Sequence, residues 1–115
     1  MKFWLLALVA SSLAGCDRDP GGGGAPGDGR AVFESLCAAC HGPDGRPPAA
    51  MVARLGVRDL TAAEFRARVT PGLVEQQVRT GSRTKLMPAF AGLLEDAQIR
   101  AVAAYVASPQ FVAPP

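Results

Sequence analysis

Aromatic residues and histidine are scarce in this chain of 115 residues. The sequence contains five phenylalanines, one tyrosine, one tryptophan and one histidine. The tryptophan, Trp4, lies in an apolar stretch near the N-terminus, outside the part expected to fold. The remaining apolar side chains are mostly alanine and valine, so a core made of protein alone would be thin. This scarcity favours a fold whose interior is completed by a large apolar cofactor.

The chain also lacks a concentrated charge of either sign. Its 12 basic and 10 acidic side chains leave a formal net charge of +2. Proteins that bind nucleic acid usually carry a concentrated basic face, so we expect no nucleic-acid partner. The length suffices for one small domain once the terminal segments are set aside.

Residues 1–15 have the layout of a secretory signal peptide of the lipoprotein type. A positive start is followed by the apolar run Phe3–Ala10, which is too short for a comfortable membrane span. The sequence Leu13-Ala14-Gly15-Cys16 resembles the lipobox of bacterial lipoproteins, in which the peptide is cut before a cysteine that is then acylated. We therefore expect lipidation of Cys16. The alternatives are an uncleaved anchor, or an ordinary signal peptide with a chance cysteine.

Residues 16–29 consist mainly of glycine, proline, aspartate and arginine, and contain nothing that a core would bury. This composition predicts a flexible tether, with a reach of about 20 Å. A lipid on Cys16 would make the protein a membrane-anchored lipoprotein that faces the periplasm. The folded domain is expected over residues 30–111, followed by a short tail at 112–115.

The segment from Cys37 to His41 gathers two thiols and the only imidazole of the chain. Two cysteines three residues apart, followed at once by histidine, form the attachment pattern of c-type haem. On a helix this spacing places Cys37 and Cys40 on one face, where each sulfur can bond a vinyl group of the same porphyrin. We expect one covalent haem c, with His41 as the proximal iron ligand.

Hydrophobic periodicity and helix-end signals predict an all-α fold of four short helices, with no convincing strand. The first helix is expected from Arg30 to Cys40, after which Pro47-Pro48 keeps the loop extended. Thr61 and Glu64 read as a capping box for a second helix that ends near Val69.

Thr70 is the predicted cap of the third helix, which has Pro71 at its first position and stops at Gly81. The last helix is expected over 96–107. The side chains predicted to face the interior are Leu73, Val74, Gln77 and Val78 in the third helix, and Ile99, Val102, Ala103 and Val106 in the last.

Met87, in the sequence Leu86-Met87-Pro88, is the candidate for the distal iron ligand. A thioether is a soft, neutral ligand that favours ferrous iron, and Met/His ligation raises the reduction potential. Met51 is the rival ligand. The alternative for Met87 is a loop methionine that packs on apolar neighbours.

From the tether onward, the sequence resembles the class I cytochromes c. The resemblance rests on Gly29, Phe33, Cys37, Cys40, His41, Met87, Pro88, Phe90 and Tyr105. It implies a small all-α fold around one haem with an exposed edge, and single-electron shuttling between redox proteins such as an oxidase, a reductase or a dehydrogenase. It also implies that Tyr105, in the last helix, packs against the first helix near Gly29 and Phe33.

The resemblance further implies that a proline carbonyl accepts the hydrogen bond from Nδ1–H of the haem-ligating histidine. Pro47 and Pro48 are both candidates for this carbonyl. The domain lacks a tryptophan to reach a haem propionate, for which Arg46, Arg54 and Arg58 are substitutes.

Three other functions compete with electron transfer. A haem protein with an open distal site would act as a sensor or enzyme, and a thiol–disulfide module would use Cys37 and Cys40 directly. Zinc binding is disfavoured because only three nearby ligands exist. Arg79, Arg83 and Lys85 are candidates for a positive collar that steers an acidic partner, although a solvated surface explains them equally well.

Overall fold

The computed structural model describes residues 28–114, and the predicted signal peptide, Cys16 and most of the predicted tether lie outside this range. Among the described residues no helix is both long and apolar enough to cross a membrane. They form helices and loops without a β-strand, apart from an isolated bridge between Ala91 and Leu94. The helices are α1 (Gly29–Val32), the π-helical η1 (Phe33–Cys37), α2 (Ala38–His41), α3 (Ala49–Leu55), α4 (Ala63–Arg68), α5 (Pro71–Thr80), α6 (Asp96–Ala107) and the 3-10 turn η2 (Pro109–Phe111). The predicted all-α fold is confirmed.

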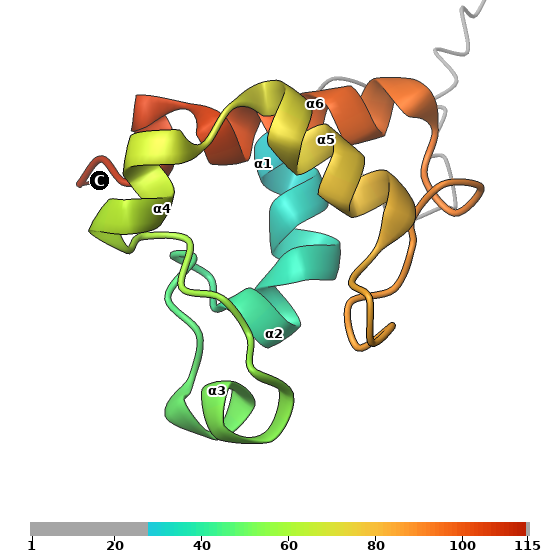
Figure 1. Cartoon of the computed structure of the whole chain (residues 1–115). Coiled ribbons are helices and arrows are strands. Elements are labelled where there is room, and N and C mark those ends of the chain that lie inside the picture. The colour runs from blue at the N-terminus through green and yellow to red at the C-terminus, as the bar shows by residue number, and fades with distance from the viewer. Residues whose placement is uncertain (1–27, 115) are drawn as a thin grey trace, which may run out of the picture.

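The segments α1, η1 and α2 follow one another without a break and correspond to the helix predicted from Arg30 to Cys40 (Figure 1). The helix begins one residue earlier because Asp28 caps it, its side chain accepting a hydrogen bond of 3.0 Å from the backbone N–H of Ala31. The π-helical turn was not predicted. A single π turn leaves the spacing of the apolar residues compatible with an ordinary α-helix, so periodicity does not distinguish the two.

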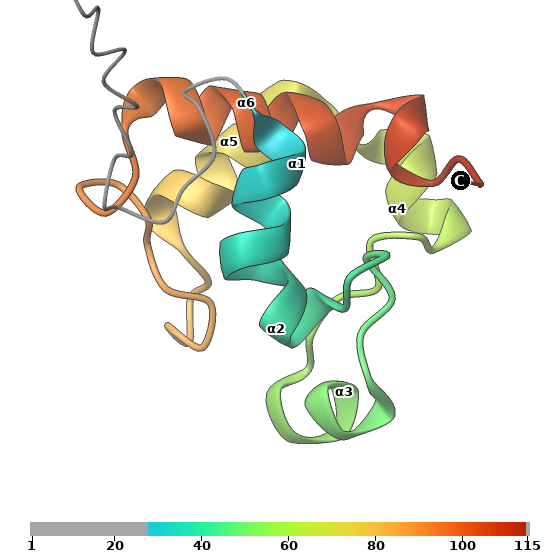
Figure 2. The same ribbon diagram turned by 180° about the vertical axis from the view of Figure 1, so that it is seen from behind.

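The centre of the fold is the contact between α1 and α6, with α5 packed beside α6 (Figures 1 and 2). Gly29 is buried in this contact, and a Cβ on it would overlap the carbonyl oxygen of Ala101 and lie 2.8 Å from Cβ of Tyr105. Only a residue without a side chain allows the two helices to approach so closely.

Three aromatic rings stabilise this crossing. Phe33 on η1, Tyr105 on α6 and Phe111 on η2 meet edge to face, with ring centroids 5.1 to 6.0 Å apart. Each ring therefore presents its positive edge to a neighbour's negative face. The predicted packing of Tyr105 near Gly29 and Phe33 is confirmed.

The predicted inner face of α6 is also confirmed, whereas that of α5 is only half right. All four predicted α6 side chains, Ile99, Val102, Ala103 and Val106, are at most 4% exposed. In α5, Val78 is buried and Val74 packs against the core, but Leu73 is 56% exposed. Gln77 is exposed as well, because its amide turns to the helix end and donates to the carbonyl of Gly81 at 2.8 Å.

Helix α3 corrects the prediction that Pro47-Pro48 keeps the following loop extended. Pro48 has an extended ψ of 144° and stands at the N-cap, so the helix begins directly after the second proline. Gly56, in the left-handed conformation with φ 63°, ends the helix. The two prolines therefore precede a helix start, a position that proline tolerates.

The predicted capping box of Thr61 and Glu64 is wrong. The hydroxyl of Thr61 donates to the carboxylate of Asp59 at 2.6 Å, and its backbone N–H donates to the same oxygen at 2.8 Å. This turn at Asp59 occupies the side chain that would have capped α4, and α4 starts after Ala62 without a side-chain cap.

The signals read for α5 are confirmed at both ends. The hydroxyl of Thr70 accepts from the backbone N–H of Leu73 at 3.2 Å, Pro71 is the first helical residue, and Gly81 follows the last turn. The last helix has the predicted bounds, Asp96–Ala107.

The substitution Gly29→Ala tests the close crossing of α1 and α6. We expect it to lower the free energy of unfolding by about 1–3 kcal/mol, because the new methyl group has no room against Ala101. The matched control is Gly72→Ala in α5, where the nearest atom outside the local backbone is 4.0 Å away. That change should be neutral or stabilise by up to about 1 kcal/mol. Equal effects of the two substitutions in denaturant titrations would contradict the proposed role of Gly29.

Candidate functional site

The two cysteines and the histidine of the predicted site share the end of the first helical segment. Cys37 ends η1, and Cys40 and His41 lie in α2. Both cysteines are unbonded and partly buried, and Cys37 packs against the hydrophobic core. Figures 1 and 2 show α2, α3 and the 81–91 loop at the end of the molecule away from α6. The elements that carry the predicted site residues thus lie at the same end of the molecule.

The imidazole of His41 is held by a backbone carbonyl. Its Nδ1 lies 3.1 Å from the oxygen of Arg58. A carbonyl oxygen only accepts hydrogen bonds, so Nδ1 carries the proton and Nε2 has a free lone pair. Burial lowers the pKa of His41, although the Arg58 bond opposes this, and the ring is therefore held in the neutral form that ligates metals.

The carbonyl that His41 bonds belongs to neither of the predicted prolines. Pro47 and Pro48 lie just before α3, and the chain returns to His41 only after that helix, 17 residues beyond the histidine. Because the segment that forms α3 is predicted as an extended loop, no sequence pattern indicates that Arg58 lies beside the imidazole. The predicted hydrogen bond from Nδ1–H to a backbone carbonyl is present, but the accepting carbonyl belongs to Arg58 and not to a proline.

The thiol of Cys37 has little tendency to ionise. Burial, reinforced by the nearby Cys40, raises the pKa of Cys37 to about 11. Cysteines that serve in thiol–disulfide exchange have a lowered pKa, which supplies the thiolate near neutral pH. The environment of Cys37 therefore disfavours the thiol–disulfide alternative.

Met87 lies in the loop between α5 and α6, and its backbone is fixed on both sides. Its N–H donates to the hydroxyl of Ser82 at 3.0 Å, and its carbonyl accepts from the N–H of Ser82 at 2.9 Å. Gly81 has a φ of 72°, and a Cβ added to it would lie only 2.5 Å from the carbonyl oxygen of Met87, so this position requires glycine. The side chain is partly buried and packs against the core. Met51, the rival ligand, lies on α3.

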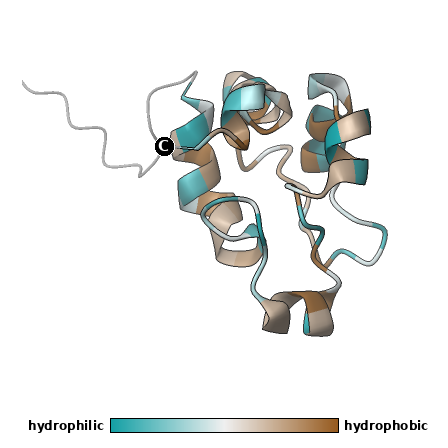
Figure 3. Ribbon diagram, turned by 90° about the vertical axis from the view of Figure 1, so that its left-hand side faces the viewer, coloured by the Kyte–Doolittle hydropathy of each residue, from teal (hydrophilic) through white to brown (hydrophobic). Residues whose placement is uncertain are grey.

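Apolar side chains remain uncovered beside these candidates. Leu36 precedes Cys37 and is 46% exposed, and Leu86 precedes Met87 and is 53% exposed. Val52 on α3 is 47% exposed, and Figure 3 shows α3 coloured mainly as apolar. The site region therefore offers apolar surface to a ligand.

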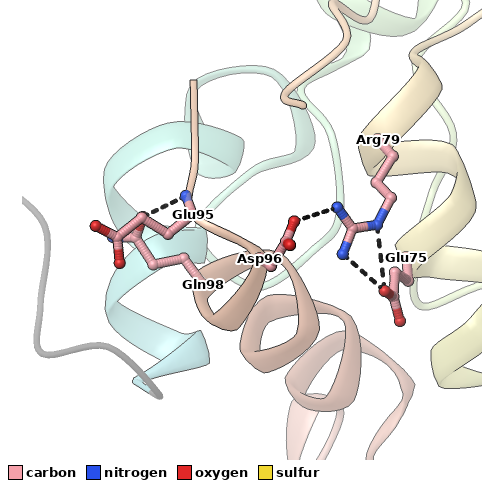
Figure 4. Close-up of polar contacts among 5 residues, drawn as sticks. All are labelled: Glu75, Arg79, Glu95, Asp96 and Gln98. Carbon is pink, nitrogen blue, oxygen red and sulfur yellow. Dashed lines mark hydrogen bonds and ion pairs between the residues drawn. The ribbon is translucent and has the colours of Figure 1, made fainter. Parts of the chain in front are cut away.

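Arg79, one of the three residues of the predicted positive collar, is paired with two carboxylates. Its guanidinium is 2.7 Å from Asp96 and 2.9 Å from Glu75, as Figure 4 shows. The paired guanidinium holds the pKa of Asp96 below its ordinary value. Arg79 thus ties α5 to the start of α6, while Arg83 and Lys85 remain exposed.

Figure 4 also shows a capping contact at the start of α6 that was not predicted. The side-chain oxygen of Gln98 accepts from the backbone N–H of Glu95 at 3.0 Å, within a capping box at the start of α6. The signal was present as Glu95 followed three residues later by Gln98.

The all-α fold and the Cys-Cys-His helix end define a c-type cytochrome, and comparison with known proteins agrees. The family model described as "Cytochrome C oxidase, cbb3-type, subunit III" matches residues 24–106. Cytochrome c6 of a Synechococcus species is 33% identical over 102 residues, which cover 89% of this chain and 86% of that protein. The solved KustC0563 c-type cytochrome superposes with a TM-score of 0.62 and 28% identity, covering 70% of this chain and 94% of that one.

Two oxidase subunits are also similar. The cbb3-type cytochrome c oxidase subunit CcoP of Azospirillum brasilense is 31% identical over 78 residues, 68% of this chain and 26% of that subunit. Subunit FixPc of Rhizobium leguminosarum is 33% identical over 101 residues, 87% of this chain and 33% of that subunit. The chain thus spans a third or less of the length of these two relatives.

The chain belongs to the mono-haem class I cytochrome c family, with a domain of the cbb3-type subunit III kind. It is an electron-carrying c-type cytochrome, and its cofactor is covalently bound haem c.

Proposed function

We propose that the chain is a single-electron carrier in which Cys37 and Cys40 retain the haem by thioether bonds, while His41 and Met87 ligate the iron. The hydrogen bond between His41 and the Arg58 carbonyl is the observation that supports this most, because it leaves Nε2 as the ligating nitrogen. The cofactor supplies an iron that alternates between Fe(II) and Fe(III).

The residues present fit this cofactor in number and chemistry. Two unbonded thiols, an imidazole with a free Nε2, and a thioether make up the donor set. The partly exposed apolar side chains of Leu36, Leu86 and Val52 suit the faces of a porphyrin. Within 28–114, His41 is the only histidine, so no second imidazole competes for the proximal role.

The two residues proposed to hold the iron would have complementary roles. The Arg58 carbonyl holds the His41 ring and increases the basicity of Nε2, which favours ferric iron. Met87 provides a soft, neutral sulfur that favours ferrous iron. The paired hydrogen bonds with Ser82 hold the backbone that carries this sulfur. Balance between the two residues sets the reduction potential, and a fixed geometry limits reorganisation during electron transfer.

The substitution Met87→Ala tests the distal assignment. We expect the haem to stay attached, the reduction potential to fall because the sulfur no longer favours ferrous iron, and carbon monoxide to bind the reduced protein. The matched control is Met51→Ala on α3, which should leave potential and carbon monoxide binding unchanged. If the two variants exchange these outcomes, Met51 is the ligand. If the unchanged protein already binds carbon monoxide readily, the open-site alternative replaces the carrier.

The cellular setting forms part of the same proposal. We propose that residues 1–15 are a signal peptide, that Cys16 is lipidated, and that residues 16–29 tether the domain at the periplasmic side of a membrane. The partners would be larger redox proteins. A terminal oxidase is favoured among them, because the similar CcoP and FixPc proteins are named as oxidase subunits.

The substitution Cys16→Ser tests the anchor. Expressed with its export signal, the unchanged protein should fractionate with membranes and carry acyl chains on a mature N-terminus at Cys16, since more than one chain is needed for stable anchoring. The serine variant should lose the acyl mass and leave the membrane fraction while keeping its haem. An unmodified Cys16 in membrane-bound wild-type protein would show that the anchor is of another kind.

A further inference from the structure

Arg66 on α4 donates hydrogen bonds to three backbone carbonyls that belong to two separate parts of the chain. One terminal nitrogen, NH1, lies 2.7 Å from the oxygen of Val106 and 3.3 Å from that of Leu60. The other, NH2, lies 3.0 Å from the oxygen of Ser108. The guanidinium also stands 5.5 Å from the ring centroid of Phe111. Its planar fork suits this bridging, since it spreads the donors over several nitrogens, whereas a lysine ammonium presents all three of its donors from one nitrogen.

Two of these carbonyls belong to the end of α6. The last carbonyls of a helix lack intrahelical partners and carry the negative end of the helix dipole, so a cation there is stabilising. Val106 is 4% exposed and belongs to the most deeply buried stripe of the molecule. On this side, therefore, Arg66 is attached to the most firmly packed element.

The third carbonyl belongs to the loop that holds His41. Leu60 comes two residues after Arg58, whose own carbonyl accepts the bond from His41. The N–H of Leu60 donates to the oxygen of Gly45 at 2.9 Å. The side chain of Asp59 closes a turn with Thr61 between these two attachments. The stretch 58–61 is thus short, folded on itself and attached to α6 through Arg66.

We propose that Arg66 is a positioning residue for the proximal imidazole, fixing the 58–61 loop so that the Arg58 carbonyl stays on Nδ1 of His41. This rests on the proposed role of His41 as an iron ligand. Without the guanidinium, the loop keeps its bond to Gly45 but loses its attachment to the end of α6. The Arg58 carbonyl then holds Nδ1–H less firmly, Nε2 becomes a weaker donor, and ferric iron is less stabilised.

The experiment uses the full-length, haem-loaded protein and the variants Arg66→Met, Arg66→Lys and Arg68→Met. Arg68 lies on the same helix, is exposed, and bonds only within α4, to the carbonyl of Glu64. We measure the midpoint reduction potential, and by NMR the solvent-exchange rate of the His41 Nδ1 proton. Arg66→Met should shift the potential upward and speed the exchange. Arg66→Lys should raise the potential and speed the exchange by smaller amounts. Arg68→Met should change neither the potential nor the exchange rate.

The outcomes separate this inference from the proposed function. If Arg66→Met lowers thermal stability but leaves the potential and the exchange rate unchanged, Arg66 is only structural and the inference is wrong. If Arg66→Met does not retain haem, the reduction potential and the Nδ1 proton exchange rate of Arg66→Lys test the inference instead, and two unchanged values would show that it is wrong. If the unchanged protein shows no iron-coupled histidine signals, the proposed ligation by His41 fails and the inference fails with it.

Discussion

The close crossing of α1 and α6 is the constraint on which the other contacts depend. Gly29 lets the two backbones meet, and the rings of Phe33, Tyr105 and Phe111 fill the space beside the crossing. Because α2 continues directly from this helix, the crossing sets where Cys37, Cys40 and His41 lie. Three of the few aromatic residues thus lie at the helix crossing that orients the site.

The remainder of the site is made of loops attached to that frame. The loop after α5 is fixed through Ser82 and Met87: the Met87 N–H donates to the Ser82 hydroxyl, and the Ser82 N–H donates to the Met87 carbonyl. The loop after α3 is fixed through Leu60, which bonds Gly45 by its N–H and Arg66 by its carbonyl. Several attachments thus restrain each of these two loops, as the precise positioning of a functional side chain requires.

The sequence allowed prediction of the features that local chemistry decides. The bounds of α5 followed from Thr70, Pro71 and Gly81, and the buried face of α6 followed from the apolar stripe around Ile99, and the structure agrees on both. The helical position of Cys37 and Cys40 followed from hydrophobic periodicity, and the helix extends one residue further, to His41. These signals act over a few residues, so no knowledge of tertiary contacts was needed to read them.

Prediction failed where another residue, nearby or distant in sequence, competes for the same group. Thr61 looked like a helix cap, but the carboxylate of Asp59 takes its hydroxyl. A proline carbonyl was expected on His41, but α3 brings Arg58 there instead. Arg66 gave no local signal at all, because its three carbonyl partners lie 6, 40 and 42 residues away. Such contacts depend on the path of the whole chain.

Covalent attachment of one haem through Cys37 and Cys40 is the central claim, and peptide mass measurement after thiol alkylation tests it most directly. The exported protein is denatured, treated with an alkylating reagent and digested, and the fragment containing both cysteines is weighed. The account predicts that this fragment carries the mass of one haem and no alkyl group. A fragment without haem, in which both sulfurs are alkylated, would contradict it.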